Sequence, residues 1–280
     1  MSWILNNEPT VRLGAFLGVF AVMALWELAG ARRRLTTAKG ARWLANLGIT
    51  VVNTVVVRFI FPTAAVGMAV VAAERGWGVL NQVSAPVAIT IVGAVLFLDL
   101  AIYLQHVMFH AVPMLWRLHM VHHADVDFDV TTGLRFHPVE IVLSMLIKLA
   151  VVLFLGPPVV AVLIFEVLLN ATAMFNHGNV RIVSSFDRVL RWLVVTPDMH
   201  RVHHSVIRQE TNSNFGFNLP WWDRLLGTYR AQPAAGQEAM TIGLEQYQEQ
   251  RRQTLPWLLV LPFAGRTGRY PVGREGDAAS

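Results

Sequence analysis

The stretch that decides the fold lies between residues 106 and 123. It reads HVMFH at residues 106–110 and, after eight further residues, HMVHH at residues 119–123. On a helix, histidines spaced by three or four residues lie on one side, so each set turns its imidazole rings the same way. The His-x-x-His-His spacing returns at residues 200–204, which read HRVHH. Because imidazole is a common ligand of iron, zinc, copper and nickel, the three clusters together predict a metal site.

Eight of the ten histidines belong to these clusters, although the chain is otherwise poor in polar residues. A single histidine on a helix is usually structural. Many neutral rings packed together must find hydrogen-bond donors in one another, whereas a transition metal uses their lone pairs directly. Three helices meeting at the clusters would enclose two metal ions with about four imidazoles each. The predicted ligands are His106, His110, His119, His122, His123, His200, His203 and His204.

The composition indicates an integral membrane protein. Hydrophobic residues make up 54% of the 280 residues and charged residues only 15%, whereas soluble domains carry about a quarter charged residues. The chain has no cysteine, which excludes thiolate metal sites, cysteine-held iron–sulfur clusters and disulfide bonds. The formal charge of +5 is spread over short basic runs beside apolar segments, which favours contact with membrane lipids over nucleic acid.

Apolar runs predict an all-α fold with about four to five membrane helices or hairpin arms and a helical cap that holds the histidines. The expected membrane segments are residues 13–29, 43–73, 85–104 and a hairpin of residues 139–175. With Pro62 inside it, the second segment is long enough for one kinked span, which we expect, or for a hairpin. The Gly-Pro-Pro sequence at residues 156–158 would turn the hairpin of residues 139–175. Lys148 is awkward for a deep span, so the hairpin either crosses the bilayer or enters it only partly.

The basic cluster Arg32-Arg33-Arg34 places the end of the first span in the cytoplasm. If residues 43–73 cross once, all three histidine clusters then fall on the cytoplasmic face. Residues 183–195, which mix apolar and basic side chains, read as an amphipathic helix in the plane of the membrane interface.

Further motifs make the sequence resemble the membrane fatty acid hydroxylase and sterol desaturase superfamily over roughly residues 92–230. In the order of that superfamily, the chain has WRLHMVHH (116–123), RFHPVE (135–140), NH (176–177), PDMHRVHHS (197–205), NFG (214–216), WDR (222–224) and GTY (227–229). We therefore expect N-terminal membrane helices in residues 1–84, a fatty acid hydroxylase-like catalytic region in residues 85–232, and an interfacial segment with a tail in residues 233–280.

The resemblance implies a di-iron centre on the cytoplasmic face, with the eight clustered histidines as its ligands and catalytic residues. It also implies O2 as oxidant and a separate electron-donor protein, since the sequence has no flavin- or haem-binding module of its own. His177 is expected as a ninth ligand, whereas His137 either completes the metal shell or caps a helix beside Pro138. The carboxylates expected to orient metal-bound imidazoles are Asp125, Glu140, Asp198 and Asp99.

The expected reaction is hydroxylation of a C–H bond in a fatty acyl, sterol-like or ether lipid, and the sequence does not separate it from desaturation. Two alternatives stay open, because the ligand count also suits zinc: a membrane protein that binds or transports zinc or iron without catalysis, and a structural zinc protein. Arg191, Arg201 and Arg208 either dock the electron donor or face anionic lipid.

Overall fold

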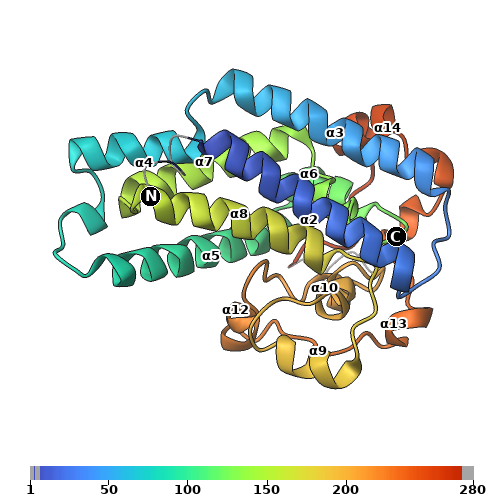
Figure 1. The fold of residues 1–280 in the computed structure, drawn as a ribbon. Coiled ribbons are helices and arrows are strands. Elements are labelled where there is room, and N and C mark those ends of the chain that lie inside the picture. Colours follow the sequence, from blue (N-terminus) through green and yellow to red (C-terminus); the bar gives the residue numbers. More distant parts are fainter. Residues whose placement is uncertain (1–2, 4–6, 273–280) are drawn as a thin grey trace.

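The computed structural model describes Trp3 and residues 7–272 (Figure 1). Apart from two isolated β-bridges, the regular structure of this part of the chain is helical, so the all-α prediction is confirmed. Within it, five helical segments are long and apolar enough to cross a membrane. These are α2 (Glu8–Gly30), the segment Lys39–Asn81, α5 (Val87–Ala111), α7 (Pro138–Leu155) and α8 (Val159–Asn176). The chain is an integral membrane protein.

The segment Lys39–Asn81 consists of α3 (Lys39–Ile60), α4 (Ala64–Arg75) and the short 3-10 helix η1 (Val79–Asn81). The helix breaks before Pro62, whose ring removes the backbone N–H that a continuing helix needs. Figure 1 shows α4 continuing in the direction in which α3 ends. The sequence therefore predicted the kink correctly, and the two helices do not form a hairpin.

The α7–α8 hairpin turns at Gly156, whose φ of 61° lies in the left-handed region that favours glycine. Each arm has 18 residues. At about 1.5 Å per residue this gives roughly 27 Å, close to the thickness of a bilayer core. Lys148 of the first arm lies 3.0 Å from Glu166 of the second, and Arg12 of α2 lies 3.2 Å from the same carboxylate. The lysine is thus neutralised inside the helical bundle.

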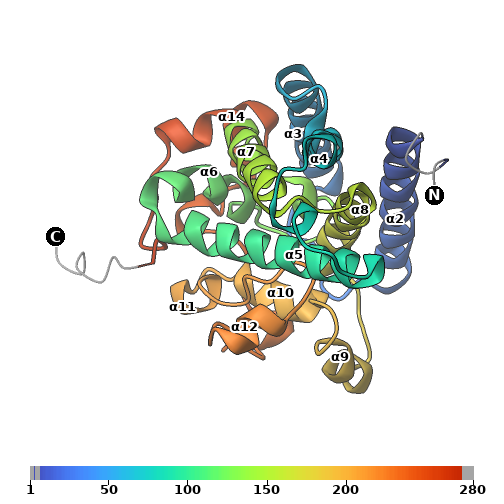
Figure 2. The ribbon, with the colours of Figure 1, turned by 90° about the vertical axis from the view of Figure 1, so that its left-hand side faces the viewer.

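Short helices form a cap at the end of the bundle where α5 and α8 finish and α7 begins. They are α6 (Pro113–His123), η2 (Thr132–Leu134), α9 (Ser184–Leu190), α10 (Pro197–His203), α11 (Arg208–Thr211), α12 (Trp221–Leu225), α13 (Gly236–Ala239), η3 (Glu245–Tyr247), η4 (Gln250–Arg252) and α14 (Leu255–Ala264). Figure 2 shows α5 between α6 on one side and α10 to α12 on the other. Helix α6 also packs on α5, and α10 packs on α8.

The C-terminal part of the chain belongs to this cap. Helix α14 packs against α3 and α6, and its Leu258 and Leu261 are buried in a cluster around Trp116. Tyr270 is also buried and stacks on Trp116, with 5.7 Å between ring centroids. Residues up to 272 are therefore folded, whereas residues 273–280 of the predicted tail lie outside the described residues.

Helix α9 is shorter than the predicted interfacial helix of residues 183–195. Its apolar side chains and those that follow it are exposed, among them Phe186, Val189, Trp192 and Leu193. An exposed apolar face is what an interfacial helix presents to the lipid, so the membrane contact of this segment stays a prediction.

Candidate metal centre

Nine histidines gather in the cap as two groups of buried side chains. The ligand atoms of each group all lie within 4.8 Å of one another. The group of five consists of His106 and His110 on α5, His119 and His123 on α6, and His203 on α10. The group of four consists of His122 on α6, His177 at the end of α8, and His200 and His204 on and directly after α10.

Each His-x-x-His-His motif is divided between the two groups. On α6, His119 and His123 are four residues apart and face the group of five, whereas His122 faces the group of four. Successive residues on an α-helix point about 100° apart, so His122 and His123 turn to different sides. The same separation holds for His203, the last residue of α10, and His204, which follows it. The motif therefore contributes histidines to both groups, and the two groups meet where the rings of His123 and His204 stack with centroids 4.6 Å apart.

Backbone carbonyls and one amide fix the orientation of four rings. The Nδ1 atoms of His106, His203 and His177 lie 2.7 Å from the carbonyl oxygens of Phe215, Ser213 and Ala173, respectively. His110 Nδ1 lies 3.1 Å from Oδ1 of Asn212, whose Nδ2 donates to the carbonyl of Tyr270. A carbonyl oxygen only accepts, so each of these Nδ1 atoms carries the proton and each Nε2 atom keeps its lone pair.

These lone pairs face one another. His106 Nε2 lies 3.0 Å from Nε2 of His119 and 3.0 Å from Nε2 of His203. His106 and His203 have already donated their protons from Nδ1, so no proton is left to bridge their Nε2 atoms. In the group of four, His177 Nε2 lies 3.1 Å from Nε2 of both His122 and His200. The contact between the Nε2 atoms of His106 and His203 therefore joins two acceptors, which is repulsive unless a cation lies beside them.

Further ring nitrogens in the two groups are buried without a hydrogen-bond partner among the described residues. They are Nε2 of His110, Nδ1 of His122 and His200, and both nitrogens of His123 and His204. Buried polar atoms are normally hydrogen-bonded, and each one that is not needs a reason. A metal ion in each group would bind one nitrogen of each ring, among them Nε2 of His110 and one nitrogen each of His123 and His204, so the residues present fit a two-metal centre.

Burial also keeps these rings neutral. It lowers the pKa of His119 and of His177 to about 3, and it lowers the pKa of His200, His203 and His204 well below the usual value. A metal ligand must offer a deprotonated nitrogen, which a neutral imidazole does at neutral pH.

Only one of the four predicted carboxylate partners contacts a histidine. Glu140 Oε1 lies 2.6 Å from Nδ1 of His119, so it holds that ring as a carboxylate typically holds a metal-bound imidazole. Asp125 pairs with Arg42 and hydrogen-bonds Thr132. The remaining two bind other groups: Asp198 pairs with Arg32 and Arg201, and Asp99 accepts from the indole of Trp222.

His137 lies outside both groups. Its Nδ1 accepts from the backbone N–H of Val139 at the start of α7, and its Nε2 lies 3.2 Å from the carbonyl of Leu259 in α14. Of the two roles predicted for His137, these contacts fit that of a helix cap.

The Asn214-Phe215-Gly216 turn explains how the Phe215 carbonyl reaches His106. Asn214 adopts a φ of 53°, and Asp223 accepts from the backbone N–H groups of Phe215 and Gly216 at 2.8 and 2.9 Å. A Cβ atom on Gly216 would lie 2.8 Å from Oδ2 of Asp223, so glycine is needed there. Burial of Asp223 raises its pKa to about 6. The Asn214-Phe215-Gly216 turn thus places the carbonyl group that accepts a hydrogen bond from His106 on α5.

Aromatic rings cover the centre. Phe136 stacks on His122 with 4.4 Å between centroids, and Phe217 lies 5.2 Å from the ring of His106. Phe217 also packs against the apolar cluster between the membrane helices. Phe217 therefore places an apolar ring between the centre and these helices.

The predicted basic docking patch does not form as expected. Arg191 and Arg201 are both buried, and they pair with Asp187 and Asp198. Arg201 also lies over the ring of Phe128, 5.0 Å from its centroid. Two of the three arginines of the predicted patch are therefore buried in ion pairs inside the cap and are not available to a partner.

Comparison with known proteins gives a consistent result. Residues 91–228 match the family described as fatty acid hydroxylase. Ornithine lipid hydroxylase OlsE from Rhizobium tropici is 30% identical over 148 residues, which are 53% of this chain and 44% of that protein. Alkylglycerol monooxygenase from Homo sapiens is 29% identical over 144 residues, which are 50% of this chain and 30% of that protein. The Xenopus tropicalis enzyme of the same name is 29% identical over 136 residues, 47% of this chain and 28% of that protein.

The chain thus spans less than half the length of each of these relatives, and no solved structure matches it. The matched residues 91–228 include both histidine groups and the Asn214-Phe215-Gly216 turn. Over residues 91–228, which are about half of its length, the chain matches the fatty acid hydroxylase family.

Proposed function

We propose that this chain is a membrane-bound di-iron oxygenase that hydroxylates a C–H bond of a lipid. One observation supports the proposal: nine buried imidazoles gather in two adjacent groups, each with ligand atoms within 4.8 Å of one another, at one end of a membrane-helix bundle. Ionisable groups of a metal transporter would be distributed along the spans, whereas these histidines gather at one end.

The ligand set favours iron. Imidazole binds iron and zinc alike, but structural zinc sites are closed by four ligands, and one of the groups here offers five. The chain has no thiolate that would select zinc in a tetrahedral sulfur site. Two iron ions bound by these groups would supply the activation of O2 and the oxidising power that an aliphatic C–H bond requires.

In the overall reaction, the lipid C–H bond, O2, two electrons and two protons give an alcohol and water. The residues of the chain have separate tasks in it. Glu140 holds the Nδ1 proton of His119, and the Phe215 and Ser213 carbonyls hold those of His106 and His203, so the inward nitrogens stay unprotonated. Phe217 adds an apolar wall that limits the access of water.

The substrate and the electron source follow from the setting. Two relatives are named for reactions on an ornithine lipid and on an alkylglycerol, which supports a fatty acyl, sterol-like or ether lipid as substrate. The sequence has no cysteine for an iron–sulfur cluster, which supports a separate electron-donor protein. Arg32 and Arg33 at the end of α2 lie at the histidine end of the bundle, which supports a cytoplasmic active site.

The first experiment is elemental analysis of the full chain purified in detergent, with Mössbauer spectroscopy after growth on isotopically enriched iron. We expect close to two irons per chain with a coupled di-ferric signal. Two zinc ions, with no iron after anaerobic reconstitution, would refute the oxygenase. Membrane lipids incubated with the reduced enzyme and isotopically labelled O2 should gain one labelled oxygen atom; an alkene in place of the alcohol would indicate a desaturase.

Three substitutions complete the test. His122→Ala removes one ligand from the group of four and His203→Ala one from the group of five, so both should lose metal and turnover while membrane insertion persists. His137→Ala is the control, because His137 belongs to neither group. Turnover retained in both ligand variants would contradict the ligand assignment.

A further inference from the structure

The N-terminal helices α2 and α3 lie outside the matched residues 91–228, yet each sends a buried charged side chain into the loops that hold the histidines. We infer that Glu27 of α2 and Arg42 of α3 are positioning residues of the metal centre, an inference that rests on the proposed function. Neither residue contacts a histidine; each acts through a loop attached to one.

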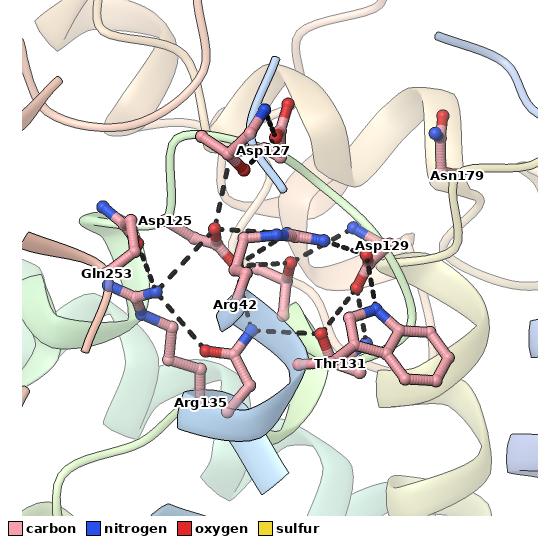
Figure 3. A network of polar contacts seen from close by, with 12 residues as sticks. Arg42, Asp125, Asp127, Asp129, Thr131, Arg135, Asn179 and Gln253 are labelled. Atoms are coloured by element: carbon pink, nitrogen blue, oxygen red, sulfur yellow. Dashed lines mark hydrogen bonds and ion pairs between the residues drawn. The ribbon is translucent and has the colours of Figure 1, made fainter. Parts of the chain in front are cut away.

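Arg42 acts on the end of α6. Its side chain is fully buried, and its Nη1 atom lies 3.2 Å from both carboxylate oxygens of Asp125 (Figure 3). Its Nη2 atom donates to Asp129, whose carboxylate also accepts from the indole of Trp43 at 2.9 Å. Asp125 follows His123 by two residues, so the guanidinium fixes the loop that directly continues α6.

Arg135 completes this cluster from the other side. Its Nε atom donates to the carbonyl of Val121 at 2.8 Å, which lies in the last turn of α6 between His119 and His122. Its Nη1 atom lies 3.7 Å from Asp125. The two arginines and the two aspartates Asp125 and Asp129 balance in charge, so loss of Arg42 leaves one buried negative charge without compensation.

Glu27 joins two loops to each other. Its Oε1 atom accepts from the backbone N–H of Val130 at 2.7 Å and from that of Asn179 at 2.9 Å. Val130 belongs to the loop after α6, and Asn179 follows His177 by two residues. One carboxylate oxygen therefore sets the distance between the segments that carry His122 and His177, whose Nε2 atoms lie 3.1 Å apart in the group of four.

Movement of these loops would affect both histidine groups. Because α6 supplies ligands to both groups, a shift of its end changes both coordination shells and the spacing between them. Residues that orient metal ligands without binding the metal themselves typically contribute about 10- to 100-fold to metal affinity. A shift of one group relative to the other would also change the bridging geometry, and with it the magnetic coupling, of two bound irons, whereas a substitution that only lowers stability would leave the coupling unchanged.

The test compares variants of the full chain by metal retention against a chelator, with iron and zinc both counted, and by the Mössbauer signal. Arg42→Met should retain metal about 10-fold less tightly and show altered coupling. Arg58→Met is the matched control, since Arg58 is an exposed arginine of the same helix. Glu27→Met should behave like Arg42→Met, whereas Glu27→Gln keeps an acceptor oxygen and should resemble the wild type.

Wild-type metal retention and coupling in both Arg42→Met and Glu27→Met would overturn the inference. If Arg42→Met does not give monodisperse protein, Arg42→Met/Asp129→Asn replaces it, because this pair restores the charge balance of the cluster. Weakened metal retention in the double variant supports the inference, and wild-type retention overturns it. A wild-type protein that holds no metal pair would instead refute the proposed function, so the two failures are distinguishable.

Discussion

Glu140 offers the most direct test of how the chain holds its metal ligands. Its carboxylate accepts a hydrogen bond of 2.6 Å from Nδ1 of His119, and its other oxygen has no hydrogen-bond partner among the described residues. In Glu140→Leu, the Nδ1 proton of His119 would be buried without an acceptor, which costs about 1–3 kcal/mol. If that cost falls on the metal-bound state, the affinity of the group of five falls about 5- to 150-fold.

Glu140→Gln separates the hydrogen bond from the charge. The amide oxygen can accept from Nδ1, so the ring keeps its orientation and most of the affinity should return. Glu74→Leu, at an exposed glutamate of α4, is the matched control. The assay is iron retained per chain over a series of chelator concentrations, with turnover measured on the same samples. Wild-type retention in Glu140→Leu would refute the argument that this carboxylate holds His119.

Three further outcomes are expected. His137→Ala should lower the free energy of unfolding by about 1 kcal/mol, as loss of a helix cap does, and should leave the metal count unchanged; a loss of one metal per chain would make it a ligand. Lys148→Met, which leaves Glu166 with Arg12 alone, should destabilise the bundle by about 1.5 kcal/mol in thermal unfolding without altering the metal signal, and an unchanged melting temperature would show that the pair is not formed. Anaerobic removal of the metals by chelation should lower the stability of the cap by about 4 kcal/mol if the ions are present at roughly a thousand times their Kd, and equal melting temperatures with and without metal would contradict binding at these groups.

The fold was readable from the sequence where it depends on local patterns. Apolar runs identified the spans, Pro62 the kink in Lys39–Asn81, and the Gly-Pro-Pro sequence the turn of the α7–α8 hairpin. Helical spacing likewise identified the histidines of α5, α6 and α10, because residues three or four apart share a helix face wherever the helix lies. His177 was reached through its motif, and the end of α8 brings it into the group of four.

The remainder depends on how distant segments dock. Phe215, Ser213 and Ala173 hold histidines through backbone carbonyls, which leave no mark in the side-chain sequence. The sequence signal nearest to them was the Asn-Phe-Gly and Trp-Asp-Arg motifs, whose Asp223 supports the Phe215 turn. Arg42 lies 83 residues before Asp125, and nothing local to either residue indicates that they pair.

The division of the His-x-x-His-His motif shows why its spacing matters. With three histidines at i, i+3 and i+4, the first and last share a face, and the middle one is turned toward a second point. On α6 the outer pair, His119 and His123, serves the group of five, whereas on α10 the outer pair, His200 and His204, serves the group of four. Helix α6 thus gives two histidines to the group of five and one to the group of four. The motif on α10 gives one histidine to the group of five and two to the group of four. The rings of the two helices meet in the cap, so together they form part of both groups. Helix α5 adds two histidines to the group of five, and the end of α8 adds His177 to the group of four. A shift of either helix must therefore disturb both sites together, which is why the loops held by Glu27 and Arg42 bear on the whole centre.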